Sequence, residues 1–241
     1  MKKIIRYIVM LVALCGLIFS LYKIINWKKD VDDNKDTQEK IQEYVQVEPE
    51  KDEFKIDFNE LSKRNSDTIA YVYVPNTNIN YVVVKGTDNA FYLNHNFDKK
   101  KNSGGWMFMD YSNTGSINDK NIVIYGHNMK DGSMLANLRR TMNKEWYENS
   151  DNHLITYINK SGTYKYKVFS QYITTEAEEY YINTSFESDS AFKEFVKSIK
   201  KRSYVNYDLD IDSVKSVLTF STCSSIGNGR VVMHAALVNE E

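Results

Sequence analysis

A long apolar run near the N-terminus dominates the pattern of the chain. Residues 7–22 carry no charge, and only Arg6 and Lys23 interrupt the stretch from Ile4 to Trp27. As a helix this stretch would measure about 36 Å. That length crosses a hydrocarbon core of about 30 Å, with both cations close enough to its ends to reach the headgroups. The pattern predicts an uncleaved membrane anchor over residues 1–27.

Two other N-terminal signals fit this run less well. A cleaved signal peptide needs a small-x-small site at the end of its apolar region, and none is present. A lipoprotein needs a small residue before its modified cysteine, but the large residue Leu14 precedes Cys15. Basic residues flank the run on both sides, but acidic residues follow Lys29. We expect a single-pass protein of the cell membrane, with the N-terminus inside and the bulk of the chain extracellular.

Residues 28–52 are polar and strongly charged. They show no sustained buried periodicity, although Ile41, Tyr44 and Val45 fall on one side of a possible helix over Thr37–Gln46. We interpret this segment as a charged stalk that holds the following domain, residues 53–241, away from the membrane.

From about residue 53 the pattern becomes that of a β-rich domain. Asp57 and Glu60 have the spacing of a capping box and predict a short opening helix. Eight runs rich in Val, Ile, Tyr and Phe, separated by turn residues, predict strands. These runs are Thr68–Val74, Asn80–Val84, Gly105–Met109, Asn121–Tyr125, His153–Ile158, Thr163–Thr174, Val214–Thr222 and Arg230–Val238. Helical spacing is confined to Ser133–Arg140 and Ser188–Lys200. Eight strands with few long helices favour a closed barrel or a sandwich.

Composition narrows the function classes. The chain has 31 Lys+Arg against 32 Asp+Glu, so its net charge of −1 leaves no basic surplus for a nucleic-acid partner. The 18 tyrosines lie mostly within predicted strands, which favours packing over an aromatic ligand platform. Two cysteines exclude a disulfide-stapled domain. No His-x-x-x-His or Cys-x-x-Cys pair is present, and we expect no metal and no cofactor.

Cys223 is the one thiol expected outside the membrane. An unpaired cysteine in an oxidising compartment is a liability unless it is buried or used. Strand alternation places Thr219, Ser221 and Cys223 on the more polar face of their strand. A turn-rich hexapeptide follows, and then Arg230 begins the next strand. In an antiparallel hairpin the thiol and the guanidinium would lie at the same rim, where the cation would favour a thiolate or an oxyanion.

His127 also lies at a strand end, just after Asn121–Tyr125 and beside a glycine. Taken alone, each of the three residues has an ordinary structural interpretation: a buried cysteine, a solvated arginine, a packed histidine. Together Cys223, His127 and Arg230 supply a nucleophile, an acid–base group and an oxyanion donor. Cysteine attack on a carbonyl requires those three roles.

Several motifs then resemble one family. The segment Thr-Phe-Ser-Thr-Cys at residues 219–223, followed by Arg230, resembles the signature of sortases, the transpeptidases of Gram-positive cell surfaces. The segment Gly-His-Asn-Met at residues 126–129, with Asp-Gly-Ser-Met at 131–134, is similar to the histidine segment of class B sortases. Matches of the same kind occur at residues 74–81, 92–95 and 108–111, and the helix before the cysteine strand is typical of class B. Phe220 departs from the usual leucine but faces away from the thiol by alternation.

This resemblance implies an eight-stranded sortase β-barrel with added helices. It implies that Cys223 attacks the threonine carbonyl of a C-terminal sorting signal of the NPxTN or LPxTG type on a secreted protein. His127 would protonate the leaving amine and then activate an amine of a peptidoglycan precursor, while Arg230 stabilises the oxyanion. Family matches further suggest substrate contacts at Asn89, Leu93, Tyr181, Ser221 and Ser224.

Two other functions stay open at this point. A pilin-polymerising sortase would use a lysine of another subunit as the acceptor. A non-catalytic, membrane-anchored surface scaffold would explain the tyrosine-rich domain without chemistry.

Overall fold

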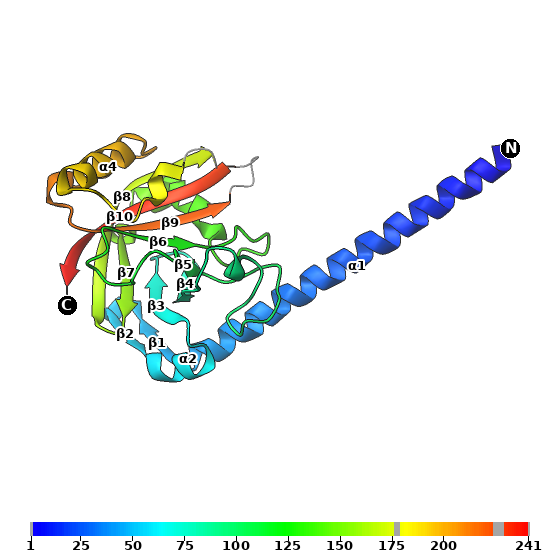
Figure 1. Cartoon of the computed structure of the whole chain (residues 1–241), viewed down its shortest axis with the longest axis horizontal. Helices are drawn as coiled ribbons and strands as arrows, with labels where there is room; N and C mark the ends of the chain where they lie inside the picture. Colours follow the sequence, from blue (N-terminus) through cyan, green and yellow to red (C-terminus); the bar gives the residue numbers. More distant parts are fainter. Residues whose placement is uncertain (1, 176–178, 224–228, 241) are drawn as a thin grey trace.

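The eight predicted strands form a closed barrel, seen in a computed structural model (Figure 1). The structure describes residues 2–175, 179–223 and 229–240, with only the backbone of residues 2, 179, 223, 239 and 240. The barrel strands are β3 (Thr68–Tyr73), β4 (Asn80–Val84), β5 (Phe108–Met109), β6 (Asn121–Tyr125), β7 (Leu154–Asn159), β8 (Gly162–Thr175), β9 (Val217–Cys223) and β10 (Gly229–Glu240). Around the barrel they follow the order β10-β8-β7-β3-β4-β5-β6-β9. The prediction of a closed eight-stranded barrel is confirmed.

Two parallel contacts interrupt an otherwise antiparallel ladder. β4 pairs with β5 in parallel, and so does β6 with β9. Parallel neighbours need a crossover connection. The crossover between β6 and β9 contains β7, β8 and the helix α4 (Asp189–Lys201), which explains why strands distant in sequence end side by side.

Alternation along the strands builds two apolar clusters. One fills the barrel and includes Leu218, Phe220 and Met233. The other lies on the outer face, beneath α4, and receives Val217 and Val232 from the same strands. Phe192, Phe195, Val196 and Ile199 of α4 cover this second cluster, as their helical spacing predicts. Ser188 caps the helix by accepting from the Ala191 amide at 3.1 Å.

Of the other two predicted helices, one is present as predicted and one differs in type and start. The predicted opening helix is α2 (Phe58–Arg64), where Asp57 accepts from the amides of Asn59 and Glu60. The predicted helix over Ser133–Arg140 is instead a 3-10 helix, η3 (Ala136–Met142), and it begins later than predicted because Met134 adopts a φ of +54° that a right-handed helix excludes. The remaining short elements are η1 (Pro49–Lys51), η2 (Phe91–Leu93), α3 (Lys144–Tyr147), η4 (Ser150–His153), η5 (Glu179–Ile182) and η6 (Ile211–Ser213).

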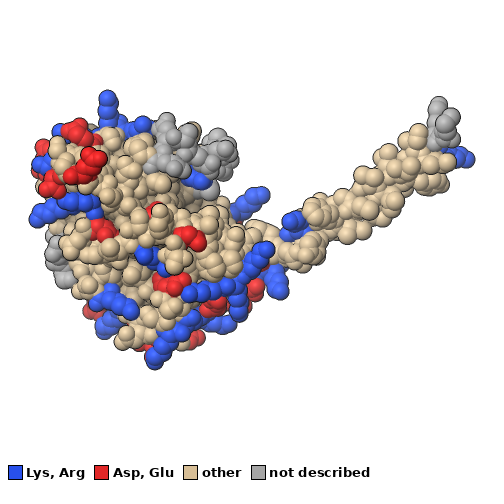
Figure 2. Space-filling model, viewed as in Figure 1, with Lys and Arg blue, Asp and Glu red and all other residues tan. Residues whose placement is uncertain are grey.

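A single helix, α1 (Lys2–Gln42), contains both the predicted anchor and part of the predicted stalk. Its apolar part projects from the domain with exposed, almost uncharged side chains, as Figure 2 shows. It is long and apolar enough to cross a membrane. Further along, Asn34, Thr37 and Ile41 are buried against the domain. The polar stretch therefore packs on the barrel over part of its length, while the division at residues 27 and 52 stays a prediction.

A short hairpin links α1 to the barrel. Its strands β1 (Val45–Glu48) and β2 (Glu53–Ile56) pair in register from Val45↔Ile56 to Glu48↔Glu53. No strand was predicted here, because two four-residue strands within a charged segment are too short to stand out by alternation. Val45 is buried at its base, which fixes the end of α1 to the core.

Candidate active site

The ends of β6, β9 and β10 meet at one rim of the barrel. In the parallel pair, Tyr125 lies opposite Ser221. His127 comes two residues after Tyr125, and Cys223 comes two residues after Ser221. Both positions therefore lie at the same end of the β6–β9 pair. In the antiparallel pair, Arg230 lies directly opposite Cys223. The strand register therefore brings the three predicted catalytic positions together at this rim.

A pocket of about 290 Å³ lies at this rim. Six residues predicted for catalysis or substrate contact line it: Asn89, Leu93, His127, Tyr181, Ser221 and Arg230. Cys223 ends β9 beside this lining, and its side chain lies outside the described residues. Ser224 also lies outside the described residues. The other lining residues are Phe108, Tyr125, Gly126, Ile182 and Thr222.

The pocket is on the outer face of the barrel wall. Leu218 and Phe220 of β9 face the interior cluster, so Thr219 and Ser221 belong to the opposite face. Ser221 confirms this orientation, because its Oγ lies 3.2 Å from the hydroxyl of Tyr181. The inward position of Phe220 accommodates its departure from leucine.

Gly126 brings His127 to the rim by allowing close packing. A Cβ on Gly126 would lie 2.7 Å from Sδ of Met107 and 2.9 Å from Cγ of Leu135. The Gly126 amide approaches the Ser221 carbonyl at 3.4 Å, and the His127 carbonyl accepts from the Leu135 amide at 3.0 Å. These contacts fix the backbone on both sides of the imidazole.

The imidazole of His127 is held by a backbone carbonyl. Its Nε2 lies 2.7 Å from the Leu93 oxygen. A carbonyl can only accept, so Nε2 carries the hydrogen in this contact. In a neutral ring, Nδ1 is then the nitrogen without a hydrogen. Sequence reasoning selected Leu93 for its side chain and could not have found this role of its carbonyl.

The other three histidines have structural settings. His95 stacks on Phe91 with ring centroids 4.0 Å apart, and Nε2 of His153 contacts the Tyr147 carbonyl at 2.9 Å. His234 is fully buried beneath α4, and burial lowers its pKa to about 3. Within the described residues, no group of three or more His, Cys, Asp or Glu side chains could hold a metal ion.

Asp110 organises one side of the pocket. Its Oδ2 accepts from Nδ2 of Asn89 at 2.8 Å and from the Tyr125 hydroxyl at 2.9 Å. The Asn89 side chain also accepts from the Tyr111 amide at 3.0 Å. Asn89 is therefore aimed by a buried carboxylate. Residues 108–111 contribute to the family resemblance, but nothing in the sequence singled out Asp110 as a site residue.

Asn121 organises the other side. Its Nδ2 donates to the carbonyls of Tyr181 and Asn183, at 3.2 and 2.9 Å. Asn121 is fully buried at the start of β6. It ties η5, which carries Tyr181 and Ile182, to the barrel wall. A lone asparagine at the start of a strand gave no sequence signal for this role.

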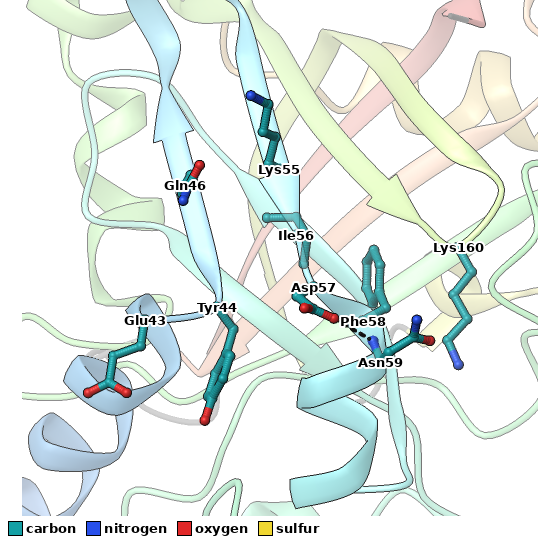
Figure 3. A pocket seen from close by; sticks show the side chains of 9 residues that line it. All are labelled: Glu43, Tyr44, Gln46, Lys55, Ile56, Asp57, Phe58, Asn59 and Lys160. Carbon is teal, nitrogen blue, oxygen red and sulfur yellow. Dashed lines mark hydrogen bonds between the residues drawn. The ribbon is translucent and has the colours of Figure 1, made fainter.

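A second hollow, of about 700 Å³, lies where α1, the β1–β2 hairpin and α2 meet (Figure 3). Its lining mixes acidic and basic side chains, including Glu43, Asp57 and Lys55. Asp57 there serves the helix, since its Oδ1 accepts from the Asn59 amide at 3.1 Å. None of the nine lining residues is a histidine, cysteine or arginine. The pocket at the rim is thus the candidate active site.

The structure thus combines a closed eight-stranded barrel with a pocket that His127 and Arg230 line, next to the strand that ends at Cys223. The sequence matches the family described as "Sortase domain" over residues 72–238. The chain belongs to the sortase family. It is therefore a cysteine transpeptidase that anchors surface proteins to the cell wall.

Class B members are prominent among its relatives. It is 33% identical to sortase B of Listeria monocytogenes over 193 residues, 78% of this chain and 76% of that protein. It is 30% identical to sortase B of Staphylococcus aureus over 243 aligned positions, 99% of this chain and 98% of that protein. The crystal structure of sortase B from Bacillus anthracis in complex with AAEK1 superposes with a TM-score of 0.75 and 30% identity, covering 88% of this chain and 99% of that one. A Staphylococcus aureus sortase B–substrate complex superposes with a TM-score of 0.69 and 29% identity, covering 93% of this chain and 100% of that one.

These relatives confirm the predicted resemblance to class B sortases. They favour neither the hypothesis of a pilin-polymerising sortase nor that of a non-catalytic scaffold. The apolar helix α1 agrees with attachment to a membrane.

Proposed function

We propose that Cys223, His127 and Arg230 carry out the two steps of the transpeptidation. The strongest support is the strand order: β9, which ends at Cys223, lies between β6, which leads to His127, and β10, which carries Arg230. The expected substrate is a secreted protein with a C-terminal sorting signal of the NPxTN or LPxTG type. The expected acceptor is an amine of a peptidoglycan precursor.

In the first step, the Cys223 thiolate attacks the carbonyl carbon of the signal's threonine. The peptide bond after threonine breaks, and its nitrogen takes a proton from His127 as the amine departs. A thioester then joins the secreted protein to Cys223. The Arg230 guanidinium stabilises the oxyanion that forms and collapses during this exchange. An amide hydrogen of Ser224, predicted from sequence, would add to this stabilisation.

In the second step, the acceptor amine attacks the thioester. His127, now without its proton, removes one from the incoming nitrogen, and Cys223 leaves as a thiolate. A new amide replaces the old one, so no net oxidant or energy source is required. The histidine acts as acid and then as base, which requires one ring nitrogen to face both amines in turn.

The remaining pocket residues suit a peptide in extended form. Leu93, with 43% of its surface exposed, offers an apolar contact. Asn89 offers an amide for peptide hydrogen bonds, and the Tyr181 and Ser221 hydroxyls line the opposite wall. We assign these four residues to recognition of the sorting signal.

The two cysteines provide a matched test in the full chain, purified in detergent. Wild type and Cys15→Ala should cleave a fluorogenic Asn-Pro-x-Thr or Leu-Pro-x-Thr peptide at similar rates. Cys223→Ala should cleave the peptide at least about 1,000-fold more slowly, because the sequence has no other thiol outside the apolar helix. Mass spectrometry should find the peptide acyl group on Cys223 alone. Full activity in Cys223→Ala would exclude the thiol mechanism.

A second measurement separates transfer from hydrolysis. Hydroxylamine, a strong amine nucleophile, should convert the product from a free carboxylate into a hydroxamate and increase turnover. A product that is unchanged by hydroxylamine would contradict a thioester intermediate.

We further propose that α1 places its N-terminus inside the cell and the barrel outside. The support is the apolar helix with its exposed side chains and the acidic residues that follow Lys29. Protease added to intact cells should remove the barrel and leave the N-terminal segment protected.

A further inference from the structure

The second part of α1 contacts the catalytic domain along one stripe. Asp30, Asn34, Gln38 and Ile41 follow at intervals of three or four residues, so they share one face of the helix. Asn34 and Ile41 are buried, and their exposed neighbours on the helix are charged. The membrane helix therefore does not end in a free linker but docks on the barrel (Figure 1).

Three hydrogen bonds from this stripe converge on a single turn, residues 102–105. The Asp30 carbonyl accepts from Nδ2 of Asn102 at 2.7 Å, and the Asp30 carboxylate accepts from the Ser103 amide at 2.9 Å. Nδ2 of Asn34 donates to the Gly105 carbonyl at 3.1 Å. Backbone and side-chain groups of the turn are thus fixed by the helix that leaves the membrane.

The same turn fixes the segment that holds the catalytic histidine. The Asn102 amide donates to the Asn94 carbonyl at 2.8 Å, and the Trp106 amide donates to the Tyr92 carbonyl at 3.0 Å. These bonds lie on either side of Leu93, whose own carbonyl accepts from Nε2 of His127.

Gly105 makes this contact as close as a backbone permits. Its φ is +56°, and a Cβ there would lie 2.4 Å from the Tyr92 oxygen and 2.9 Å from the Leu93 oxygen. The turn cannot shift toward residues 92–93 without displacing the Leu93 carbonyl. Movement of the turn is therefore transmitted to the partner of His127.

A second route joins the helix to the histidine segment. A Cβ on Gly104 would lie 2.8 Å from Nδ2 of Asn34 and 3.0 Å from Cε of Met129. Gly104 is thus sandwiched between α1 and the residue two positions after His127.

We propose that Asp30 and Asn34 of α1 are positioning residues for the active site. They fix the 102–105 turn, which fixes the Leu93 carbonyl, which orients the His127 imidazole for proton transfer to the leaving amine. The proposal rests on the acid–base role of His127 given above. It makes the helix that leaves the membrane part of the catalytic apparatus, in addition to its role as a tether.

Gln38 supplies a matched control for Asn34. Its Nε2 donates to the Asn80 carbonyl at 2.8 Å, at the start of β4 and away from the 102–105 turn. Among the described residues, the amide oxygens of Asn34 and Gln38 are both buried without a hydrogen-bond partner. Replacing either residue by Leu removes the same kind of bond between α1 and the barrel. Only the Asn34 bond leads to Leu93.

The test compares two substrates in the full chain, held in detergent micelles. One is the fluorogenic peptide amide, whose departing amine needs a proton; the other is an aryl ester of the same peptide, whose phenolate leaves without one. We expect Asn34→Leu to slow acylation by the amide about tenfold and by the ester less than about twofold. Gln38→Leu should change neither by more than about twofold. Equal losses in the two variants, or on the two substrates, would overturn the proposal and leave α1 a purely structural support.

A measurement without substrate keeps the test independent of the proposed function. With ¹⁵N-histidine labelling, the Nε2 proton of His127 should exchange slowly with water in wild type and in Gln38→Leu, and rapidly in Asn34→Leu. Asn34→Asp, which keeps the side-chain shape but removes the donor, serves if the leucine variant folds poorly. Unchanged exchange in both Asn34 variants would refute the coupling even if the enzyme is active. If wild type does not cleave the peptide but the exchange difference between the variants is present, the proposed function would be refuted and the coupling would stand.

Discussion

His127 and His234 lie in two regions of the same barrel wall and show how differently one side chain can be used. His127 sits half-buried at the open pocket, with one ring nitrogen bonded to a backbone carbonyl. His234 is fully buried beneath α4 and has a partner on each nitrogen: Thr219 on Nδ1 at 2.8 Å and Tyr172 on Nε2 at 2.9 Å. We propose that the first exchanges a proton with the substrate, whereas the second is enclosed and held by its two partners.

The direction of the hydrogen bonds explains how His234 is held. Nδ2 of Asn121 donates to two carbonyls, so its Oδ1 accepts the hydroxyl hydrogen of Thr219 at 2.6 Å. Thr219 then accepts from Nδ1–H of His234, which leaves Nε2 to accept from Tyr172. This arrangement requires the neutral ring, consistent with the lowered pKa. The difference between the two regions lies in partners and burial: His234 lies within β10, whereas His127 follows the end of β6 in the same sheet.

The largest expected effect that separates the two regions is the loss of the His127 imidazole. His127→Asn should lower kcat/KM for the peptide amide by about 10³- to 10⁴-fold, because both steps need proton transfer. The melting temperature should change little, since the ring is half-exposed. Thermal unfolding and peptide kinetics on one preparation check both parts. A variant that keeps more than a tenth of the activity would remove His127 from the mechanism.

Arg230 should show the next largest effect. Arg230→Ala should lower the acylation rate by about 10²- to 10³-fold, the usual loss for one oxyanion donor. Arg230→Lys keeps the charge but loses the planar fork, and should recover only part of that loss. Stopped-flow acylation with the fluorogenic peptide measures both variants. Full activity in Arg230→Ala would mean that other donors stabilise the oxyanion.

On the other side of the comparison, His234 should affect stability far more than catalysis. His234→Ala removes one hydrogen-bond partner from each of the Thr219 and Tyr172 hydroxyls and opens a cavity, at a cost of about 2–4 kcal/mol in unfolding free energy. At a temperature where the variant is folded, kcat/KM should stay within about threefold of wild type. Chemical denaturation and kinetics together decide this. A catalytic loss as large as that of His127→Asn would show that the two regions are not separate.

The sequence predicted the parts of the site that strand alternation controls. Alternation along β9 predicted Ser221 on one face and Phe220 on the other, and their contacts agree. The same alternation predicts Cys223 on the face of Ser221, but its side chain lies outside the described residues. It could not predict the contacts made by backbone atoms. The Leu93 carbonyl that holds His127 carries no residue identity, and its position depends on a turn fixed from α1.

In the fold, too, the features set by apolar patterns were predicted and those set by polar contacts were not. All eight barrel strands were predicted, since each buries a run of apolar residues. The docking of α1 was missed because its buried stripe contains polar residues such as Asn34 and Thr37. Polar side chains that bond to a neighbouring backbone look like solvated positions in a sequence. The closure of the barrel came from the family resemblance, because strand patterns alone left a sandwich open.

A pH dependence of stability should expose the locked histidine. The folded-state pKa of His234, about 3, lies below the value of 6.5 for a free side chain, so the unfolded chain binds the extra proton. Stability is therefore complete above pH 6.5 and declines as the pH falls toward 3. Between pH 6.5 and 5 this group alone should lower the unfolding free energy by about 1.5 kcal/mol.

The control for this effect is His234→Gln, which keeps a donor and an acceptor but does not titrate. Burial also lowers the pKa of His153, which adds a slope of the same sign in both proteins. Asp98, whose pKa is lowered by its bond to Arg64, contributes only at more acidic pH. The difference in slope between wild type and His234→Gln isolates His234. Equal slopes would mean that its ring takes up a proton in the folded state.

The smallest expected effect lies where the two regions meet, at Tyr181. Its hydroxyl bonds to Ser221 in the pocket, while its carbonyl is held by Asn121, which belongs to the His234 network. Tyr181→Phe removes only the hydroxyl, so stability should fall by about 1 kcal/mol or less, the usual value of one neutral hydrogen bond. Because the ring keeps its place, KM for the peptide should rise only about two- to fivefold, with kcat nearly unchanged. A large fall in kcat would instead show that the Tyr181 hydroxyl acts on the reacting groups themselves, and recognition would then not be its role.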